Sequence, residues 1–174
     1  MKLMKKYLLI IAAIVIGAVS AQAQKYALID IEYILKKVPA YEMANQQLEQ
    51  VSKRWQAEVE AKVAEVETLY KNYQSEMVYL SADMKTKKEE AIVAKEKEAN
   101  DLRRKYFGPE GELYKKRQAL IQPIQDDIYN AVKAVAEAGG YQMVMDRASS
   151  QNIIYASPRI DISNEVLVKL GYSK

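Results

Sequence analysis

The stretch from Leu48 to Leu80, LEQVSKRWQAEVEAKVAEVETLYKNYQSEMVYL, decides the fold of this chain of 174 residues. It contains no Gly or Pro, and most of its residues are strong helix formers. Large apolar side chains recur at steps of three or four residues, about 3.6 on average, which is the period of an α-helix. They form one narrow stripe between polar flanks: Leu48, Val51, Trp55, Val59, Val63, Val66, Tyr70, Tyr73, Met77 and Leu80. Such a helix buries one seam against one partner and leaves its other faces in water.

The next stretch of the chain is the predicted partner of this helix. Ser81-Ala82-Asp83 interrupts the stripe, and Thr86 to Glu89 has the spacing of a capping box, which predicts a new helix start. Apolar residues then return at Ile92, Ala99, Leu102, Tyr106, Ile121, Ile124, Ile128, Val132 and Val135. We therefore expect an antiparallel helical hairpin over residues 41–138, an arm with its tip near residues 81–86. Residues 107–111, FGPEG, are expected to kink the returning helix, with Pro123 as a second candidate.

Short apolar segments at the two ends of the chain predict a β-rich body, assembled from residues 24–40 and 139–174. Residues 26–31, YALIDI, have the near-continuous apolar character of a buried strand. Residues 141–146, YQMVMD, alternate in polarity with the period of a strand, and residues 152–156 predict another.

Helix-ending and helix-starting signals separate these segments. Pro39 biases the residue before it away from helical angles, so the chain is expected to bend there. Gly139 and Gly140 are expected to end the arm. Ser163 is the predicted N-cap of a last helix, which ends before Gly171.

A body of roughly fifty residues is near the lower limit for a self-sufficient core, and the chain has no cysteine with which to staple it. We therefore expect several copies of the chain to close its strand edges in a homo-oligomer. The predicted fold class is α+β, predominantly α, with a small β body built by oligomerisation and a long antiparallel helical hairpin. The residues expected in the shared body are Leu28, Ile29, Ile31, Met143, Val144, Met145, Ile153 and Ile154.

The N-terminus has the three parts of a secretory signal peptide. Lysines within residues 1–6 precede an uncharged, mostly apolar run of about 13 residues, and Ala21-Gln22-Ala23 ends it. We expect cleavage between Ala23 and Gln24, giving a signal peptide over residues 1–23 and a secreted mature chain. The alternative is an uncleaved anchor, although the run is shorter than the ~20 residues that a membrane span needs.

Composition excludes several classes of function. The chain has no His and no Cys, which removes the commonest general base, thiolate nucleophiles and the usual transition-metal ligands. Cleavage would remove three of the 26 basic residues and leave 23 against 23 acidic ones, which argues against a nucleic-acid partner. Residues 108–111 lack the ending of a phosphate-binding loop. We therefore expect no enzyme, no catalytic or metal-binding residue, and no cofactor.

The order and spacing of these segments resemble the Skp/OmpH family of periplasmic chaperones, in its Bacteroidetes-type form. The resemblance covers the whole chain: the signal, the strand Lys25–Ile31 with residues 34–38, the hairpin, and residues 132–146, 152–155 and 161–163. It implies a homotrimer with a β-barrel body and three helical arms around a cavity. It further implies an ATP-independent holdase for unfolded outer-membrane β-barrel proteins. The interruption at residues 107–111 and the neutral mature chain depart from the family pattern, so no lipopolysaccharide contacts are carried over.

Four aromatic residues of the arm admit two interpretations. Trp55, Tyr70, Tyr73 and Tyr79 could grip unfolded apolar chains, because aromatic rings offer large apolar surfaces. The first three also belong to the stripe and would then simply pack the seam. Tyr79 lies off the stripe, so we expect it to face outward and regard it as a candidate client contact.

The charges of the arm also admit two interpretations. Residues 41–80 carry seven acidic and four basic residues, whereas residues 85–117 carry seven acidic and eleven basic ones. Opposite charges on antiparallel neighbours would set the register of the hairpin. Alternatively, two basic triplets would attract an anionic lipid surface or acidic clients: Arg103, Arg104 and Lys105, and Lys115, Lys116 and Arg117.

The functional prediction is an ATP-independent periplasmic holdase that encloses unfolded outer-membrane proteins and prevents their aggregation. A narrow seam leaves the arms without a broad apolar groove, so they offer many weak contacts and hold a client by enclosure and multivalency. The alternative is a structural coiled-coil spacer or adaptor in a cell-envelope assembly. A spacer would need a fixed partner and an even apolar seam along the whole arm.

Overall fold

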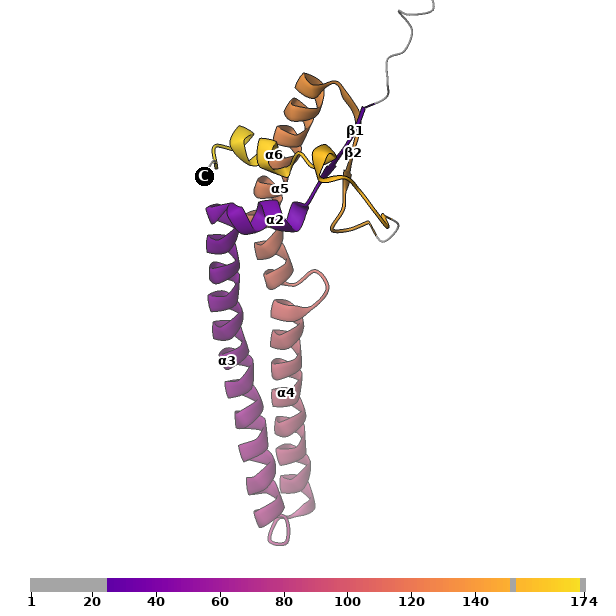
Figure 1. Cartoon of the computed structure of the whole chain (residues 1–174). Helices are drawn as coiled ribbons and strands as arrows, with labels where there is room; N and C mark the ends of the chain where they lie inside the picture. The colour runs from indigo at the N-terminus through magenta and orange to yellow at the C-terminus, as the bar shows by residue number, and fades with distance from the viewer. Residues whose placement is uncertain (1–24, 151–152, 173–174) are drawn as a thin grey trace, which may run out of the picture. The chain divides into compact units, whose positions relative to one another are not determined.

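The computed structural model describes residues 25–150 and 153–172 (Figure 1), so the predicted signal peptide and Gln24 lie outside the described residues. The elements are β1 (Lys25–Ile29), α2 (Ile31–Lys37), α3 (Pro39–Glu76), α4 (Ala82–Phe107), α5 (Glu112–Gly139), β2 (Tyr141–Asp146), the 3-10 helix η1 (Pro158–Ile160) and α6 (Ser163–Lys169). A predominantly helical fold with a long hairpin and a small sheet is confirmed. None of the described helices is long and apolar enough to cross a membrane.

The described chain forms two compact units. The arm unit is Leu35–Tyr129, and the end unit comprises the described parts of Met1–Ile34 and Asn130–Lys174. In the arm unit, α3 and α4 run antiparallel, side by side (Figure 1). Val38 before Pro39 is extended, with φ −94° and ψ 108°, and it forms the N-cap of α3, as the proline predicted.

The hairpin turns at residues 77–81, slightly before the segment 81–86 expected from the sequence. Ser81 is the N-cap of α4, and its hydroxyl accepts a hydrogen bond from the backbone N–H of Met84 at 3.4 Å. The predicted helix start at Thr86 is wrong. Thr86 lies inside α4 and its hydroxyl donates to the carbonyl of Ala82 at 3.3 Å, because Ser81 has already supplied the cap.

The returning helix is broken, not merely kinked, at Gly108–Gly111. Phe107 ends α4, Gly108 is extended with φ −64° and ψ 168°, and α5 begins at Glu112. A β-carbon at Gly111 would lie 2.8 Å from the carbonyl oxygen of Tyr106, so only glycine allows this close approach. Pro123 does not end a helix, because α5 continues through it.

The end unit contains a parallel pair of strands. In the pairing of β1 with β2, Ala27 lies opposite Val144 and Ile29 opposite Asp146. The buried core of the unit includes Ala27, Leu28, Ile29, Ile34, Ile162, Val166 and Leu167. Apolar residues of β1 therefore pack with those around α6, although more than 130 residues of sequence separate them.

The strand expected over residues 152–156 is absent from residues 153–156, which the structure describes without regular structure. The reason lies at the free edge of β1. Leu28 forms an isolated bridge with Asp161, and its carbonyl accepts a hydrogen bond from the N–H of Ile162 at 2.9 Å. That edge is therefore already used by the segment that leads into α6.

The last helix ends as predicted but begins differently. Ser163 is its first residue and Ile162 its N-cap, because the Ser163 hydroxyl is engaged by two aspartates. At the other end Gly171 has φ 87°, and the N–H of Tyr172 donates to the carbonyl of Leu167 at 2.8 Å. This is a Schellman ending, which requires the left-handed glycine. Gly140, with φ 66°, follows α5 in the same conformation.

Candidate functional site

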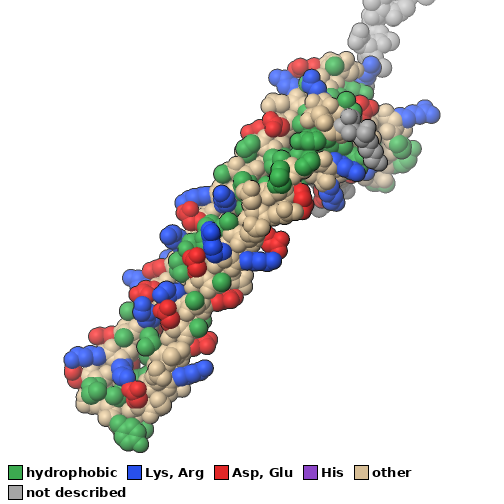
Figure 2. All heavy atoms as spheres, turned by 90° about the vertical axis from the view of Figure 1, so that its left-hand side faces the viewer, with side chains coloured by type: hydrophobic (Ala, Val, Ile, Leu, Met, Phe, Trp, Pro, Cys, Tyr) green, Lys and Arg blue, Asp and Glu red, His purple; other side chains and the backbone are tan. Residues whose placement is uncertain are grey.

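The seam between α3 and α4 buries a narrow row of side chains. Val59 on α3 and Ile92 and Ala99 on α4 are 4–6% exposed, while most other apolar residues of the stripe are half-buried. Tyr70 and Met77, towards the tip, are 51% and 43% exposed. The narrow seam predicted from the sequence is confirmed, and the face of the hairpin shown in Figure 2 carries charged side chains along its length.

An aromatic clamp ties the end of α4 to α3 just before the break. The rings of Trp55 and Tyr106 stack at 4.7 Å between centroids, with an angle of 6° between their planes. The Tyr106 hydroxyl donates to Glu58 Oε2 at 2.6 Å, and this hydrogen bond raises the pKa of Tyr106. Phe107 meets the Tyr106 ring edge-on at 6.4 Å. Trp55 therefore packs the seam, as the simpler interpretation predicted.

Tyr73 and Tyr79 have different environments near the tip. The Tyr73 hydroxyl donates to Glu89 across the hairpin, and this bond raises the pKa of Tyr73. Tyr79 is 89% exposed, which agrees with the prediction that it faces outward. Of the four aromatics, Tyr79 is therefore the one most available to a partner.

Charges of opposite sign meet across the hairpin. Lys62 pairs with Glu65 on α3 at 3.1 Å, and Lys95 pairs with Glu98 on α4 at 2.7 Å. The hydrogen bond to Glu98, followed by the charges of Glu98 and Glu65, raises the pKa of Lys95. The hydrogen bond from Lys95 has the largest effect and lowers the pKa of Glu98. Burial, the next largest effect, raises it, and the charges of Lys95 and Lys62 lower it again. This arrangement favours the interpretation that charge sets the register of the hairpin.

The two basic triplets do not form a surface of one sign. Arg104, Lys105 and Lys115 line an open pocket of about 410 Å³ at the break, together with Asp101, Glu110 and Glu112. Lys115 pairs with Glu112 at 3.1 Å, and the Lys105 ammonium lies 5.6 Å from the Tyr106 ring centre. Arg103 and Arg117 line two other pockets of the arm unit. Acidic residues thus share the surface with the cations.

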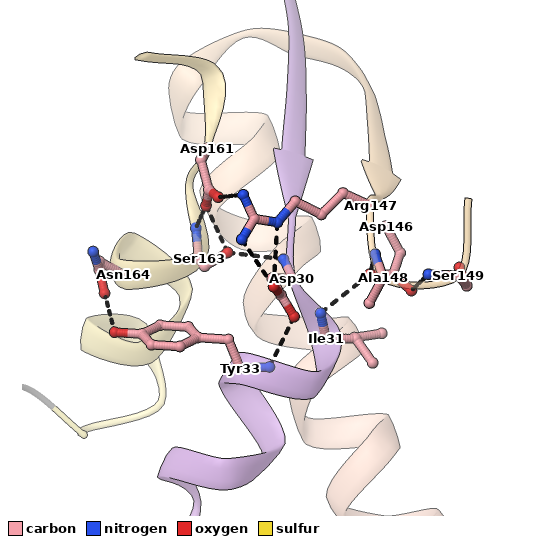
Figure 3. Close-up of polar contacts among 10 residues, drawn as sticks. All are labelled: Asp30, Ile31, Tyr33, Asp146, Arg147, Ala148, Ser149, Asp161, Ser163 and Asn164. Atoms are coloured by element: carbon pink, nitrogen blue, oxygen red, sulfur yellow. Dashed lines mark hydrogen bonds and ion pairs between the residues drawn. The ribbon is translucent and has the colours of Figure 1, made fainter. Parts of the chain in front are cut away.

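In the end unit, a polar network joins the ends of both strands to α6 (Figure 3). Asp30 accepts from the backbone N–H of Tyr33 at 2.9 Å, which caps α2, and from Arg147 Nη2 at 3.0 Å. Arg147 also reaches Asp161 at 3.5 Å. The buried Ser163 hydroxyl accepts from the backbone N–H of Asp30 at 2.9 Å and donates to Asp161 at 2.6 Å. Three segments distant in sequence are therefore held by one cluster.

The network is structural in its chemistry. The Asp30 and Asp161 carboxylates are each engaged by a cation or by hydrogen-bond donors, so neither is poised as a free base. Among the described residues no group of three or more acidic, His or Cys side chains could hold a metal ion. The sequence pointed to Ser163 only as an N-cap, and it did not predict the network of Asp30, Arg147 and Asp161. Its one available signal was Asp30, directly after an apolar strand and before a helix, which is an N-cap position.

Hydrogen bonds lower the pKa of two carboxyls in this cluster. The backbone N–H of Tyr33 has the largest effect on Asp30, and Arg147 adds to it against the opposing effect of burial. Burial raises the pKa of Asp146, but hydrogen bonds from Ser149, Ile31 and Ala148 together lower it by more, so the net shift is downward. A carboxyl with a lowered folded-state pKa contributes stability that is present above its unfolded pKa, about 4. That contribution is lost as the pH falls through the lower folded value.

Asp30→Ala should therefore destabilise the protein by about 1–2 kcal/mol at pH 7, because it removes the α2 cap and the Arg147 partner. Asp30→Asn keeps a capping oxygen and should cost less. The difference in the free energy of unfolding between Asp30→Asn and the unaltered protein should become smaller as the pH falls from 5 to 3. Urea melts followed by circular dichroism measure this difference. A difference that stays constant over this range would show that the Asp30 charge contributes nothing to folding.

Comparison with known proteins identifies the family. Residues 25–170 match the family model described as outer membrane protein (OmpH-like). The chain belongs to this family. It is also 28% identical over 153 residues to the chaperone protein Skp of Yersinia enterocolitica, covering 87% of this chain and 88% of the relative. The resemblance inferred from the sequence is thereby confirmed.

The fold agrees with a solved member of the OmpH-like family. A crystal structure of an OmpH-like protein from Caulobacter crescentus CB15 matches with a TM-score of 0.67 at 12% identity, covering 87% of this chain and 86% of that one. Skp/OmpH-like proteins are periplasmic chaperones, so the family is one of chaperones and not of enzymes.

The residues predicted to form a shared body fall into two groups in the single chain. Leu28 and Ile29 are buried, and Val144 and Ile153 are half-buried. The remaining four are exposed, at 36% or more: Ile31, Met143, Met145 and Ile154. Their part in an oligomer stays a prediction.

Proposed function

We propose that this OmpH-like chain is an ATP-independent periplasmic holdase that encloses unfolded outer-membrane β-barrel proteins and keeps them from aggregating. The observation that carries this is the arm, whose buried apolar residues lie in one narrow seam between polar flanks. An arm without a broad apolar groove binds any one segment weakly, so a client must be held by enclosure and by many contacts. Such a client stays mobile and is released without an energy source.

The proposal includes assembly into a homotrimer through the end unit. Met143 and Met145 of β2 are 51% and 36% exposed, and Ile154 is fully exposed. Apolar side chains concentrated on a small strand-containing unit are typical of a surface that another copy covers. Three arms around one cavity would give the enclosure that a single arm lacks.

The proposal also includes export with cleavage between Ala23 and Gln24, but it does not include an anionic lipid surface as a partner. Arg104, Lys105 and Lys115 share their pocket with three acidic residues, so the attraction of a lipid surface would be largely offset there. The basic triplets remain candidate contacts for acidic client side chains.

A complex of defined size should form when the mature protein is mixed with a urea-diluted porin. We expect light scattering on a size-exclusion column to give the mass of one trimer alone, and of one trimer plus one client after mixing, with no nucleotide present. A folded water-soluble protein of similar mass serves as the negative control. A trimer that elutes without client would favour the structural spacer, whereas a monomer would contradict the assembly.

A further inference from the structure

The turn that joins α3 to α4 is apolar, although turns are usually polar. Residues 77–81 read Met-Val-Tyr-Leu-Ser and contain none of the Gly, Pro, Asn or Asp that supply turn geometry. Val78 is 80% and Tyr79 89% exposed, and Met77 and Met84 beside them are 43% and 49% exposed. We call these four residues the tip patch. Figure 2 shows hydrophobic side chains at this end of the hairpin.

The geometry of the turn does not require these side chains. The turn is closed by main-chain atoms, with the N–H of Tyr79 donating to the carbonyl of Glu76 at 2.9 Å. The following helix is started by the Ser81 hydroxyl. Val78 and Tyr79 leave most of their surface in water, so they add little to folding. Large apolar residues that contribute no buried contacts indicate a surface for a partner.

Several of the charges around the tip patch are paired with one another. Glu76 pairs with Lys88 across the hairpin, and Asp83 pairs with Lys87 at 2.9 Å. Glu89 accepts the hydrogen bond of the Tyr73 hydroxyl. The four side chains of the patch are uncharged and apolar, and the neighbouring charges are mostly paired, apart from Lys85 beside Met84. The complement of the patch is an uncharged apolar group, and neither an acidic peptide nor an anionic lipid headgroup is favoured.

We propose that the tip patch binds apolar side chains of an unfolded, extended client polypeptide. This inference rests on the proposed holdase function and assigns part of the client contact to the tip. A turn is too small to cover more than one or two client side chains, so each contact is weak. The methionines suit such a contact, because flexible, polarizable side chains adapt to varied partners. Several tips in one assembly would hold one client through simultaneous contacts.

The test compares two double variants of the full-length mature protein. Val78→Ser with Tyr79→Ser removes the two most exposed apolar groups of the tip. The control is Val93→Ser with Tyr129→Ser, which removes the same two residue types from positions 61% and 68% exposed elsewhere on the arm. Ser, Val and Tyr have similar helix propensities, so the control should not unfold the helices. Circular dichroism and size-exclusion chromatography establish that both variants keep the fold and the oligomer.

The readout is fluorescence anisotropy of a labelled, urea-diluted outer-membrane β-barrel protein titrated with each variant. We expect the tip variant to bind about tenfold more weakly or worse, and the control to stay within about twofold of the unaltered protein. Equal weakening by both variants, or by neither, would overturn the tip as a specific contact while leaving the holdase proposal intact. Failure of the unaltered protein to bind would overturn the holdase proposal itself.

A second titration separates a client from a membrane. Neutral phosphatidylcholine vesicles replace the client, and co-sedimentation measures binding. We expect no vesicle binding by any variant, because the tip patch is small and lacks an unpaired ring of cations. Vesicle binding by the unaltered protein that is lost in the tip variant, with client binding unchanged, would assign the patch to a lipid surface instead.

Discussion

Ile29→Asp is expected to dissociate the proposed trimer and to remove most of the cooperative unfolding of the end unit. Ile29 is 5% exposed on β1 and lies opposite Asp146 in the parallel pairing. The new carboxylate would be buried, and it would lie opposite Asp146, which already carries a negative charge. The cost is several kcal/mol per chain, and it recurs in every copy. Thermal melts by circular dichroism and the mass from light scattering measure both effects.

Val168→Asp is the matched control for this change. Val168 lies on α6 in the same unit but is 62% exposed, so a carboxylate there stays in water. We expect its effect on stability to be within about 0.5 kcal/mol. An Ile29→Asp protein that melts like the unaltered one and keeps its mass would refute the body as the site of assembly.

Deleting residues 62–100 and joining the ends by a Gly-Asn-Gly loop should abolish most of the holding activity while the protein still assembles. The joint is chosen from contacts across the hairpin. The Tyr106 hydroxyl bonds Glu58 on the side of the break, and the Tyr73 hydroxyl bonds Glu89 on the side of the tip, so the antiparallel register places residues 61 and 101 at about the same level. The deletion shortens the arm by about 25 Å at 1.5 Å per residue. It leaves the end unit and the Trp55–Tyr106 clamp in place.

A smaller deletion tests whether arm length itself matters. Removing residues 62–72 together with 90–100 takes about three helical turns from each helix and keeps the natural turn. If clients are held by enclosure, protection against aggregation should fall in the order full length, smaller deletion, larger deletion. Equal protection by all three proteins, at equal oligomer mass, would place the client site on the end unit.

Much of the fold could be predicted because it depends on local signals. The stripe from Leu48 to Tyr73 has the period of an α-helix and lies within α3, whereas its last members, Met77 and Leu80, fall in the turn. Pro39 and Gly171 mark helix ends through their own backbone preferences. The same holds for the interruption at residues 107–111. The sequence showed that the helix is disturbed there. Only the structure shows that it is broken, because that depends on the close approach of Gly111 to Tyr106.

The features that the sequence did not predict depend on contacts between distant segments. The strand expected at residues 152–156 has a suitable composition, but the free edge of β1 already binds Asp161 and Ile162. Ser163 looked like an N-cap, yet Asp30 and Asp161 engage its hydroxyl. Asp30 lies 133 residues from Ser163, and β1 is similarly distant from residues 161–162, so no local window shows these pairings. The helix start predicted at Thr86 was wrong for a local reason, because Ser81 supplies a competing cap five residues earlier.

The measurement that tests the holdase most directly is light scattering after a urea-unfolded outer-membrane β-barrel protein is diluted into buffer without nucleotide. With the full-length mature protein present at about one trimer per client, we expect scattering to stay at the level of buffer. A folded water-soluble protein at the same concentration should leave the aggregation curve unchanged. If the full-length protein also leaves it unchanged, the chain does not hold unfolded clients, and the structural spacer becomes the better account.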